Sequence, residues 1–318
     1  MKRLGVLGTM VWDTIYGRGA ELEPVEEWGG IGYALAALEA ALPPNWEIVP
    51  LIKVGSDLAP LANDFLTELT HRTAAARFAE VREPNNRVTL RYEALDRAAE
   101  HLSGGVPSWT WEELGPMVND LDALYINFIS GFEMQLEAAH HLRHGFHGPI
   151  YADLHSLFLG VGLNGRRIPE ALDNVSSWFS CFDVIQLNED EMNLVGSDPM
   201  EVAARALGAG VSLLIVTLGP LGAVYFATSS FTFLRESRHP PHDSGPVVTA
   251  RIPAADVTEQ LDPTGCGDVF GATIVSHLVQ NVEIEEAIGH ANRFAARNLS
   301  YRGATHLHHH LRGEIVGQ

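Results

Sequence analysis

The chain has 318 residues, 46% of them hydrophobic, and a formal net charge of −19. This length and apolar content allow one large domain or two and exclude a disordered chain. The acidic balance argues against nucleic acid or an anionic membrane surface as the main partner. It does not exclude a phosphate-bearing ligand held by backbone N–H groups and a metal ion.

Apolar runs alternate with helical patterns along most of the chain. The expected strands lie at 4–7, 48–54, 87–92, 121–128, 149–153, 184–187 and 213–218, and the expected helices at 31–42, 58–69, 200–207 and 284–300. Strands that alternate with helices predict an α/β fold with a mainly parallel sheet that helices cover on both faces.

Two segments, 14–28 and 82–109, fit this alternation poorly. They flank the first strand–helix unit and the next one, so both can project from the same edge of the sheet and pair as a small β lid. The stretch 229–247 contains Pro240-Pro241 and Gly245-Pro246 and predicts a long surface hairpin. We therefore expect one domain over 1–318, with a lid formed from about 14–28 and 82–109.

The sequence predicts neither a signal peptide nor a membrane span. The apolar run near the N-terminus is short, and Asp13 interrupts it. The uncharged stretch 206–227 contains four glycines and a proline, which predicts a strand, a turn and a second strand rather than a membrane helix. Because only Cys181 and Cys266 occur, a disulfide is not expected and a reducing cytoplasm fits best. The histidine cluster at 306–310 is interpreted as a solvated tail.

The most informative stretch is Gly265-Cys266-Gly267-Asp268, which an apolar helical pattern follows. Glycines can adopt backbone angles closed to other residues, and the N-terminus of a new helix presents unpaired N–H groups that suit an anion. A carboxylate at the mouth of an anion site makes sense if it removes a proton from a hydroxyl that attacks phosphorus. The alternative is an ordinary turn with Asp268 as a helix cap.

Further short motifs occur in a fixed order along the chain. They are Asp13 after Gly8, Gly29-Gly30, Val54-Gly55-Ser56-Asp57, Asn188-Glu189-Asp190-Glu191, the turn 217–223, the stretch 262–268 and Arg302-Gly303-Ala304. In this order they resemble the ribokinase/PfkB family of carbohydrate and nucleoside kinases. The resemblance implies a ribokinase-like three-layer fold over nearly the whole length.

The resemblance also implies an ATP-dependent phosphotransferase that acts on a hydroxymethyl-type hydroxyl of a small sugar. Asp268 would accept the hydroxyl proton, and the N–H groups of Gly265-Cys266-Gly267 would hold the phosphoryl oxygens. Asp13 would accept hydrogen bonds from two sugar hydroxyls, and Gly29-Gly30 would let the sugar approach the backbone closely. A turn cap and a plain tight turn are the alternatives for these last two motifs.

The nucleotide side of the site follows from the same resemblance. Asn188 and Glu191 would hold Mg²⁺ through its waters, although a solvated helix start explains the same acids. The residues implied to border the nucleotide are Thr217, Gly219, Gly222 and Asn292. The family often uses K⁺ beside the anion hole, and Asp262 and Thr264 would be its ligands here.

Departures from the family pattern put the acceptor in question. Ala34 stands where an asparagine usually lies, four residues after the second glycine, so an expected sugar contact is missing. Cys266 replaces alanine, which leaves its backbone N–H unchanged; its thiol is either a small buried hydrophobe or an oxidisable group. The alternatives to a sugar kinase are a nucleoside kinase and a non-catalytic sensor of sugars or nucleotides. A homodimer through the lid is compatible with the pattern.

Overall fold

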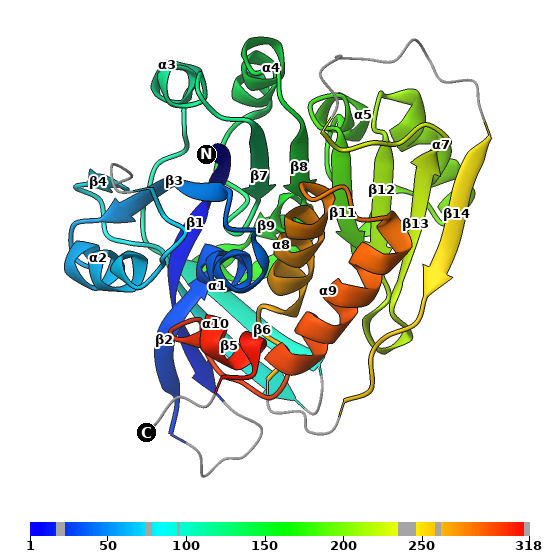
Figure 1. The fold of residues 1–318 in the computed structure, drawn as a ribbon. Helices are drawn as coiled ribbons and strands as arrows, with labels where there is room; N and C mark the ends of the chain where they lie inside the picture. The colour runs from blue at the N-terminus through cyan, green and yellow to red at the C-terminus, as the bar shows by residue number, and fades with distance from the viewer. Residues whose placement is uncertain (17–22, 74–77, 94–95, 235–245, 258–261, 315–318) are drawn as a thin grey trace.

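The computed structural model describes residues 1–16, 23–73, 78–93, 96–234, 246–257 and 262–314. Among these residues, nine strands form a central sheet in the order β14-β13-β12-β11-β8-β7-β1-β3-β4 (Figure 1). The strands from β12 to β4 run parallel, and β13 and β14 are antiparallel additions at one edge. Their bounds are β1 Lys2–Tyr16, β3 Trp46–Gly55, β4 Ala79–Val81, β7 Ala123–Asn127, β8 Ile150–Asp153, β11 Val184–Asn188, β12 Leu213–Thr217, β13 Ala223–Thr228 and β14 Val247–Ile252.

The parallel strands are continuous apolar runs because helices cover both of their faces. Every residue of β7 and of β8 is buried. One face carries α1 Ile31–Ala41, α2 Ala59–Thr67, α8 Cys266–Leu278, α9 Ile284–Asn298 and α10 Leu307–Arg312. The other face carries α3 Trp111–Leu114, α4 Leu136–Gly145, α5 Val175–Phe179, α6 Glu189–Val195 and α7 Pro199–Gly208. The expected three-layer α/β fold is confirmed.

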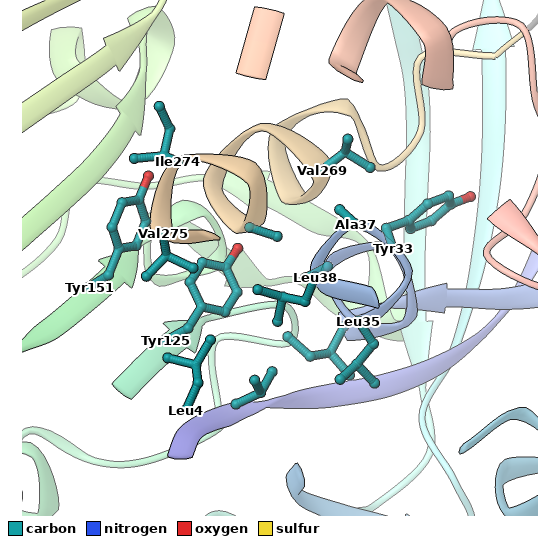
Figure 2. Packing of buried hydrophobic residues seen from close by; sticks show 14 of the residues in the cluster. Leu4, Tyr33, Leu35, Ala37, Leu38, Tyr125, Tyr151, Val269, Ile274 and Val275 are labelled. Atoms are coloured by element: carbon teal, nitrogen blue, oxygen red, sulfur yellow. The ribbon is translucent and has the colours of Figure 1, made fainter. Parts of the chain in front are cut away.

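The alanine-rich α1 and the start of α8 pack directly against each other over the sheet. Figure 2 shows Tyr33 and Ala37 of α1 near Val269 of α8, with Tyr125 and Tyr151 rising from the strands beneath. The small side chains of α1 permit this close approach, which buries the contact completely. The packing fixes the N-terminus of α8 above the strand ends.

A second, smaller sheet has the strand order β2-β1-β5-β6. It consists of β2 Val25–Gly30, β5 Arg87–Glu93, β6 Asp96–Ser103 and the far half of β1. The first strand was expected over 4–7 only, but β1 has 15 residues because it leaves the main sheet and continues into this one. Asp13 therefore lies within the small sheet, beyond the part of β1 that the sequence predicted as a strand.

Two peripheral predictions have definite outcomes. The described helices include none that is long and apolar enough to cross a membrane, and 206–227 contains β12 and β13 as expected. The solvated-tail interpretation of 306–310 is wrong for His308, which is 4% exposed because α10 packs on α1. Burial lowers the pKa of His308 to about 4. Most of the predicted hairpin at 229–247 lies outside the described residues.

Candidate active site

A cavity of about 240 Å³ lies where the carboxyl ends of β8, β11 and β12 meet the N-terminus of α8 and the small sheet. Open parallel sheets bind their ligands at this edge. The cavity brings together residues from nine short segments of the chain, many of them far apart in sequence. Its carboxyl groups are Asp13, Glu100, Asp153, Glu191 and Asp268.

Most of the predicted site residues line this cavity. These are Asp13, Gly30, Asn188, Glu191, Thr217, Thr264, Gly265, Cys266, Gly267 and Asp268. The remaining predicted residues lie outside the lining, namely Gly29, Gly219, Gly222, Asp262 and Asn292. The motifs predicted to bind the substrate and the metal and to carry the catalysis therefore meet at one cavity, whereas part of the predicted nucleotide turn does not line it.

The glycine turn starts α8 at Gly265, whose φ of 78° lies in the left-handed region. A Cβ there would collide with the ring of Tyr33, so both the backbone angle and the packing require glycine. The Cys266 N–H donates to Pro263 O at 3.3 Å. The N–H groups of Gly267 and Asp268 lie in the first helical turn, where no intrahelical acceptor is available. The N–H groups of Gly267 and Asp268 thus lie at the cavity without an intrahelical acceptor, whereas the N–H of Cys266 is engaged by Pro263 O.

The thiol of Cys266 behaves as a small buried group. Its Sγ lies 3.3 Å from Asn298 Nδ2 and 3.5 Å from Ala295 O, both on α9. Burial raises the pKa of the Cys266 thiol to about 12, so it is not activated by the helix N-terminus. Cys181 and Cys266 are both free thiols, as expected.

Asp268 is held by the strand beneath α8. Asn127 Nδ2 donates to Asp268 Oδ1 at 2.8 Å, and the Tyr125 hydroxyl donates to Asp268 O at 3.4 Å. Asn127 and Tyr125 belong to the predicted strand 121–128, yet neither was expected in the site. The available signal was a polar residue at the carboxyl end of an otherwise apolar parallel strand, where ligand-binding side chains gather.

A second polar layer lies beside Asp268. Gln186 Nε2 donates to Asp153 Oδ2 at 2.7 Å and to Gly267 O at 3.1 Å, while Tyr151 donates to Gln186 Oε1 at 2.7 Å. Burial and the charge of Glu191 raise the pKa of Asp153 to about 8. Asp153 can therefore remain protonated at neutral pH beside the other carboxylates.

Asn188 and Glu191 form the start of α6. The Asn188 side chain accepts from the Glu191 N–H at 2.9 Å, and Glu191 Oε2 accepts from the Asn188 N–H at 2.8 Å, which is a capping box. Glu191 is only 4% exposed, and its Oε1 lies 2.5 Å from His155 Nδ1. The helix-start alternative is thus correct in geometry, but these residues also line the cavity and are not a solvated face.

Asp13 and the two glycines form one packed unit across β1 and β2. Asp13 is 4% exposed and lines the cavity. A Cβ on Gly29 would occupy the place of the Asp13 carboxylate, so Gly29 makes room for that side chain. Gly30 has a φ of 58° and precedes α1. Ala34, one turn further, is fully buried in the core and does not line the cavity, whereas the neighbouring Tyr33 does.

The predicted nucleotide turn lies at the end of β12. Thr217 borders the cavity, and Gly219 has open space where a Cβ would be. Gly222 packs against the backbone of Ile252, and Asn292 Nδ2 donates to Pro253 O at 2.8 Å. Asn292 is therefore a buried brace between α9 and the segment that supports the turn, not a surface residue.

Asp262 and Thr264 form a tight turn before the glycines. Asp262 Oδ1 accepts from the Thr264 N–H at 2.9 Å and from its hydroxyl at 2.5 Å. Asp262 Oδ2 and Asn298 Oδ1 are buried and have no hydrogen-bond partner among the described residues. Buried oxygen atoms of this kind usually have a donor or a cation beside them.

Comparison with known proteins gives two kinds of similarity. Residues 163–310 match the pfkB family carbohydrate kinase model. A fructokinase from Oryza sativa subsp. japonica is 29% identical over 145 residues, which cover 42% of this chain and 39% of that protein. The matched segment thus spans well under half of the length of this curated relative.

Solved structures resemble the chain over nearly its whole length. Ribokinase from Thermotoga maritima has a TM-score of 0.71 at 17% identity and covers 98% of this chain and 99% of its own. A nucleoside kinase from Burkholderia thailandensis, solved with inosine, has a TM-score of 0.69 at 19% identity, covering 95% and 93%. A ribokinase-like protein from E. coli, solved with ATP and Mg²⁺, has a TM-score of 0.70 at 15% identity, covering 96% and 95%.

At these identities the structural likeness establishes the fold alone, while the family match rests on sequence. The matched segment contains Asn188 and Glu191, the turn at 217–223 and the glycine turn before Asp268. Both kinds of similarity agree with the predicted resemblance. The chain is similar to the pfkB carbohydrate kinase family by sequence over residues 163–310, and it shares the ribokinase fold over nearly its whole length.

Proposed function

We propose that this protein is an ATP-dependent kinase that phosphorylates a hydroxymethyl-type hydroxyl of a small sugar. One observation carries the proposal: Asp268 and the glycine turn share a single cavity with Asp13, Asn188 and Glu191. Phosphoryl transfer requires little more than this, since positioning and charge stabilisation supply most of its catalysis.

The chemistry follows from the arrangement. The substrate hydroxyl, held through Asp13, loses its proton to Asp268 as its oxygen forms a bond to the γ-phosphorus. The bond from that phosphorus to the bridging oxygen breaks, and ADP leaves with the electron pair. The N–H groups at the start of α8 stabilise the charge on the transferring phosphoryl oxygens, and each such donor is typically worth ~10²–10³ in rate.

Asn188 and Glu191 fit a Mg²⁺ ion that they would contact through its water ligands and not directly. Among the described residues, no group of three or more His, Cys, Asp or Glu side chains could hold a metal ion directly. Glu191 already accepts hydrogen bonds from Asn188 and lies against His155, so it would contact the waters of a Mg²⁺ that ATP itself carries. Bound Mg²⁺ neutralises charge on the β- and γ-phosphates, and Thr217 and Gly219 would border the nucleotide.

A K⁺ ion fits beside the glycine turn. The unpartnered Asp262 Oδ2 and Asn298 Oδ1 are buried oxygens of the type a monovalent cation binds, and Asn298 also donates to Thr264 O at 2.8 Å. Replacement of K⁺ by Na⁺ or Tris in the assay tests this part. We expect activity to fall several-fold, and an unchanged rate would remove K⁺ from the proposal.

A nucleoside is the second candidate acceptor. Apolar side chains of the small sheet and its neighbour, namely Val11, Val88, Leu90 and Ile129, line the cavity and could pack against a flat base. Ala34 lies in the core where the family pattern places a sugar contact, which weakens the case for a free sugar. A homodimer through the small sheet remains a proposal that sizing in solution would test.

The deciding experiment is an ADP-release assay of the purified protein with ATP and Mg²⁺ against panels of sugars and nucleosides. A single class of acceptor with turnover well above the acceptor-free rate supports the corresponding candidate. Absence of turnover with every acceptor, combined with ligand-induced thermal stabilisation, would support the sensor alternative and overturn the kinase proposal.

A further inference from the structure

The strand end beneath α8 holds a buried amide with an unusual contact. Asn127 is the last residue of β7 and is fully buried. Its Nδ2 donates to Asp268 Oδ1 at 2.8 Å and to the Tyr125 hydroxyl at 3.3 Å. The Tyr125 hydroxyl in turn donates to the backbone oxygen of Asp268 at 3.4 Å. One strand therefore fixes both the main chain and the carboxylate of Asp268.

The orientation of the Asn127 amide is determined by its surroundings. With the opposite orientation, Oδ1 would face the Asp268 carboxylate and two acceptors would meet without a proton between them. In the observed orientation, Oδ1 is buried and has no hydrogen-bond partner among the described residues. Leaving such an acceptor unpaired costs about 1–3 kcal/mol. An unpaired buried acceptor lowers stability, so stability alone does not explain an asparagine at position 127. The hydrogen bond that it donates to Asp268 needs a functional explanation.

We propose that Asn127 is a positioning residue for the base: its amide fixes the rotation of the Asp268 carboxylate toward the substrate hydroxyl and favours the ionised form. This inference rests on the proposed function of Asp268. A hydrogen bond donated to a carboxylate stabilises its charged state, and a base must be ionised to accept a proton. Figure 2 shows Tyr125, from the same strand, reaching toward α8 in the same layer.

The charged and titratable groups around Asp268 explain why such a donor is needed. Asp153 faces it from β8, Tyr125 from β7 and Cys266 from its own helix, and the charge of Asp268 contributes to a raised pKa at each of the three. Each of these three groups is neutral or negative, so none of the three stabilises a carboxylate by charge. His155, which lines the same cavity, lies against Glu191. The Asn127 amide instead supplies a fixed dipole with its positive end toward the carboxylate.

The test compares Asn127→Leu with wild type. We expect kcat to fall about 10- to 100-fold, with KM for ATP and acceptor changed less than about threefold, because the lost contact matters in the transition state. The acidic limb of the kcat–pH profile should move to higher pH, since Asp268 loses a donor that favours its ionised form. In Asn127→Asp a carboxyl faces the carboxylate, and the limb should move further.

Asn85→Leu is the matched control. Asn85 is also fully buried and lies outside the cavity lining; its Nδ2 donates to Met10 O, and its Oδ1 accepts from the Gly55 N–H. It should lower the unfolding temperature and leave the acidic limb in place. If Asn127→Leu and Asn127→Asp behave like Asn85→Leu, with lower stability and an unchanged limb, Asn127 is only structural and the proposal is wrong.

A second readout does not depend on turnover. The carboxyl ¹³C resonance of Asp268, assigned by its absence in Asp268→Asn, can be titrated in wild type and in both Asn127 variants. A higher Asp268 pKa in the variants supports the positioning role even if no acceptor is found, and an equal pKa overturns it. Failure of the kinase proposal, seen as no turnover in wild type, is thus distinguishable from failure of this one.

Discussion

The proposed catalytic turn and the proposed acceptor wall of the same cavity are built in opposite ways. The turn is local: Asp262, Thr264, Gly265 and Asp268 lie within seven residues, and one helix start orients them. The acceptor wall combines Asp13 of β1, Val88 of β5 and Tyr33 of α1. In a local turn each residue is constrained by the geometry of its sequence neighbours. In a wall assembled from distant strands, one side chain can be replaced without changing the others. This contrast predicts conserved chemistry with an adaptable acceptor.

Replacement of the base gives the largest expected effect. Asp268→Asn keeps the size of the side chain and removes its ability to accept a proton, so kcat should fall ~10²–10⁴-fold while ATP still binds. Steady-state kinetics with calorimetric ATP binding check this. Wild-type turnover in this variant would show that Asp268 is not the base. The assignment of catalysis to the glycine turn would then be wrong.

Gly265→Ala should come next in size. Alanine at a φ of 78° is strained, and its Cβ would collide with the Tyr33 ring, so the turn must shift away from the phosphoryl site. We expect kcat to fall about 10²-fold, comparable to the loss of an oxyanion donor. Gly208→Ala is the control, because a Cβ at Gly208 meets nothing within 4 Å. Equal activity of both variants would contradict the assigned role of the turn.

On the acceptor wall, Asp13→Asn should act on binding more than on chemistry. Loss of the charge weakens hydrogen bonds to substrate hydroxyls, and bonds of this kind contribute ~1.5–3 kcal/mol each. KM for the acceptor should rise at least about tenfold, with KM for ATP unchanged. A rise in the KM for ATP instead would place Asp13 on the nucleotide side and reverse the assignment of the two walls.

The smallest expected effect on activity is at Glu39, which does not line the cavity. Burial alone would raise its pKa, but hydrogen bonds from His71 and Thr70 lower it to about 2. A lowered carboxyl pKa stabilises the fold above the unfolded value of about 4.5, and this contribution is lost as the pH falls from there toward 2. Glu39→Gln should remove up to about 3 kcal/mol of stability near neutral pH.

Thermal unfolding of Glu39→Gln from pH 7 to pH 3 measures this directly. The difference from wild type should shrink as the pH falls, while kcat at 25 °C stays close to wild type. A difference that does not change with pH would mean that the Glu39 contacts stabilise the fold by packing alone. A large loss of kcat would mean that Glu39 contributes to the geometry of the active site, contrary to this prediction.

The sequence by itself determined the alternation of strands and helices, the glycine turn, and the order of motifs on which the family resemblance rests. These are local signals: a buried parallel strand must be an apolar run, and a left-handed turn must contain glycine. It also predicted ten of the residues that line the cavity. Such features are predictable because neighbouring residues in the chain are enough to impose them.

Only the tertiary structure decided how β1 continues past the main sheet, so that Asp13 faces the cavity from within a second sheet. It also revealed Asn127 beneath Asp268, and it showed that Asn292 and His308 are buried rather than exposed. In each case the deciding partner lies far away in the sequence: strand pairing and helix packing set these contacts, and no local pattern encodes them.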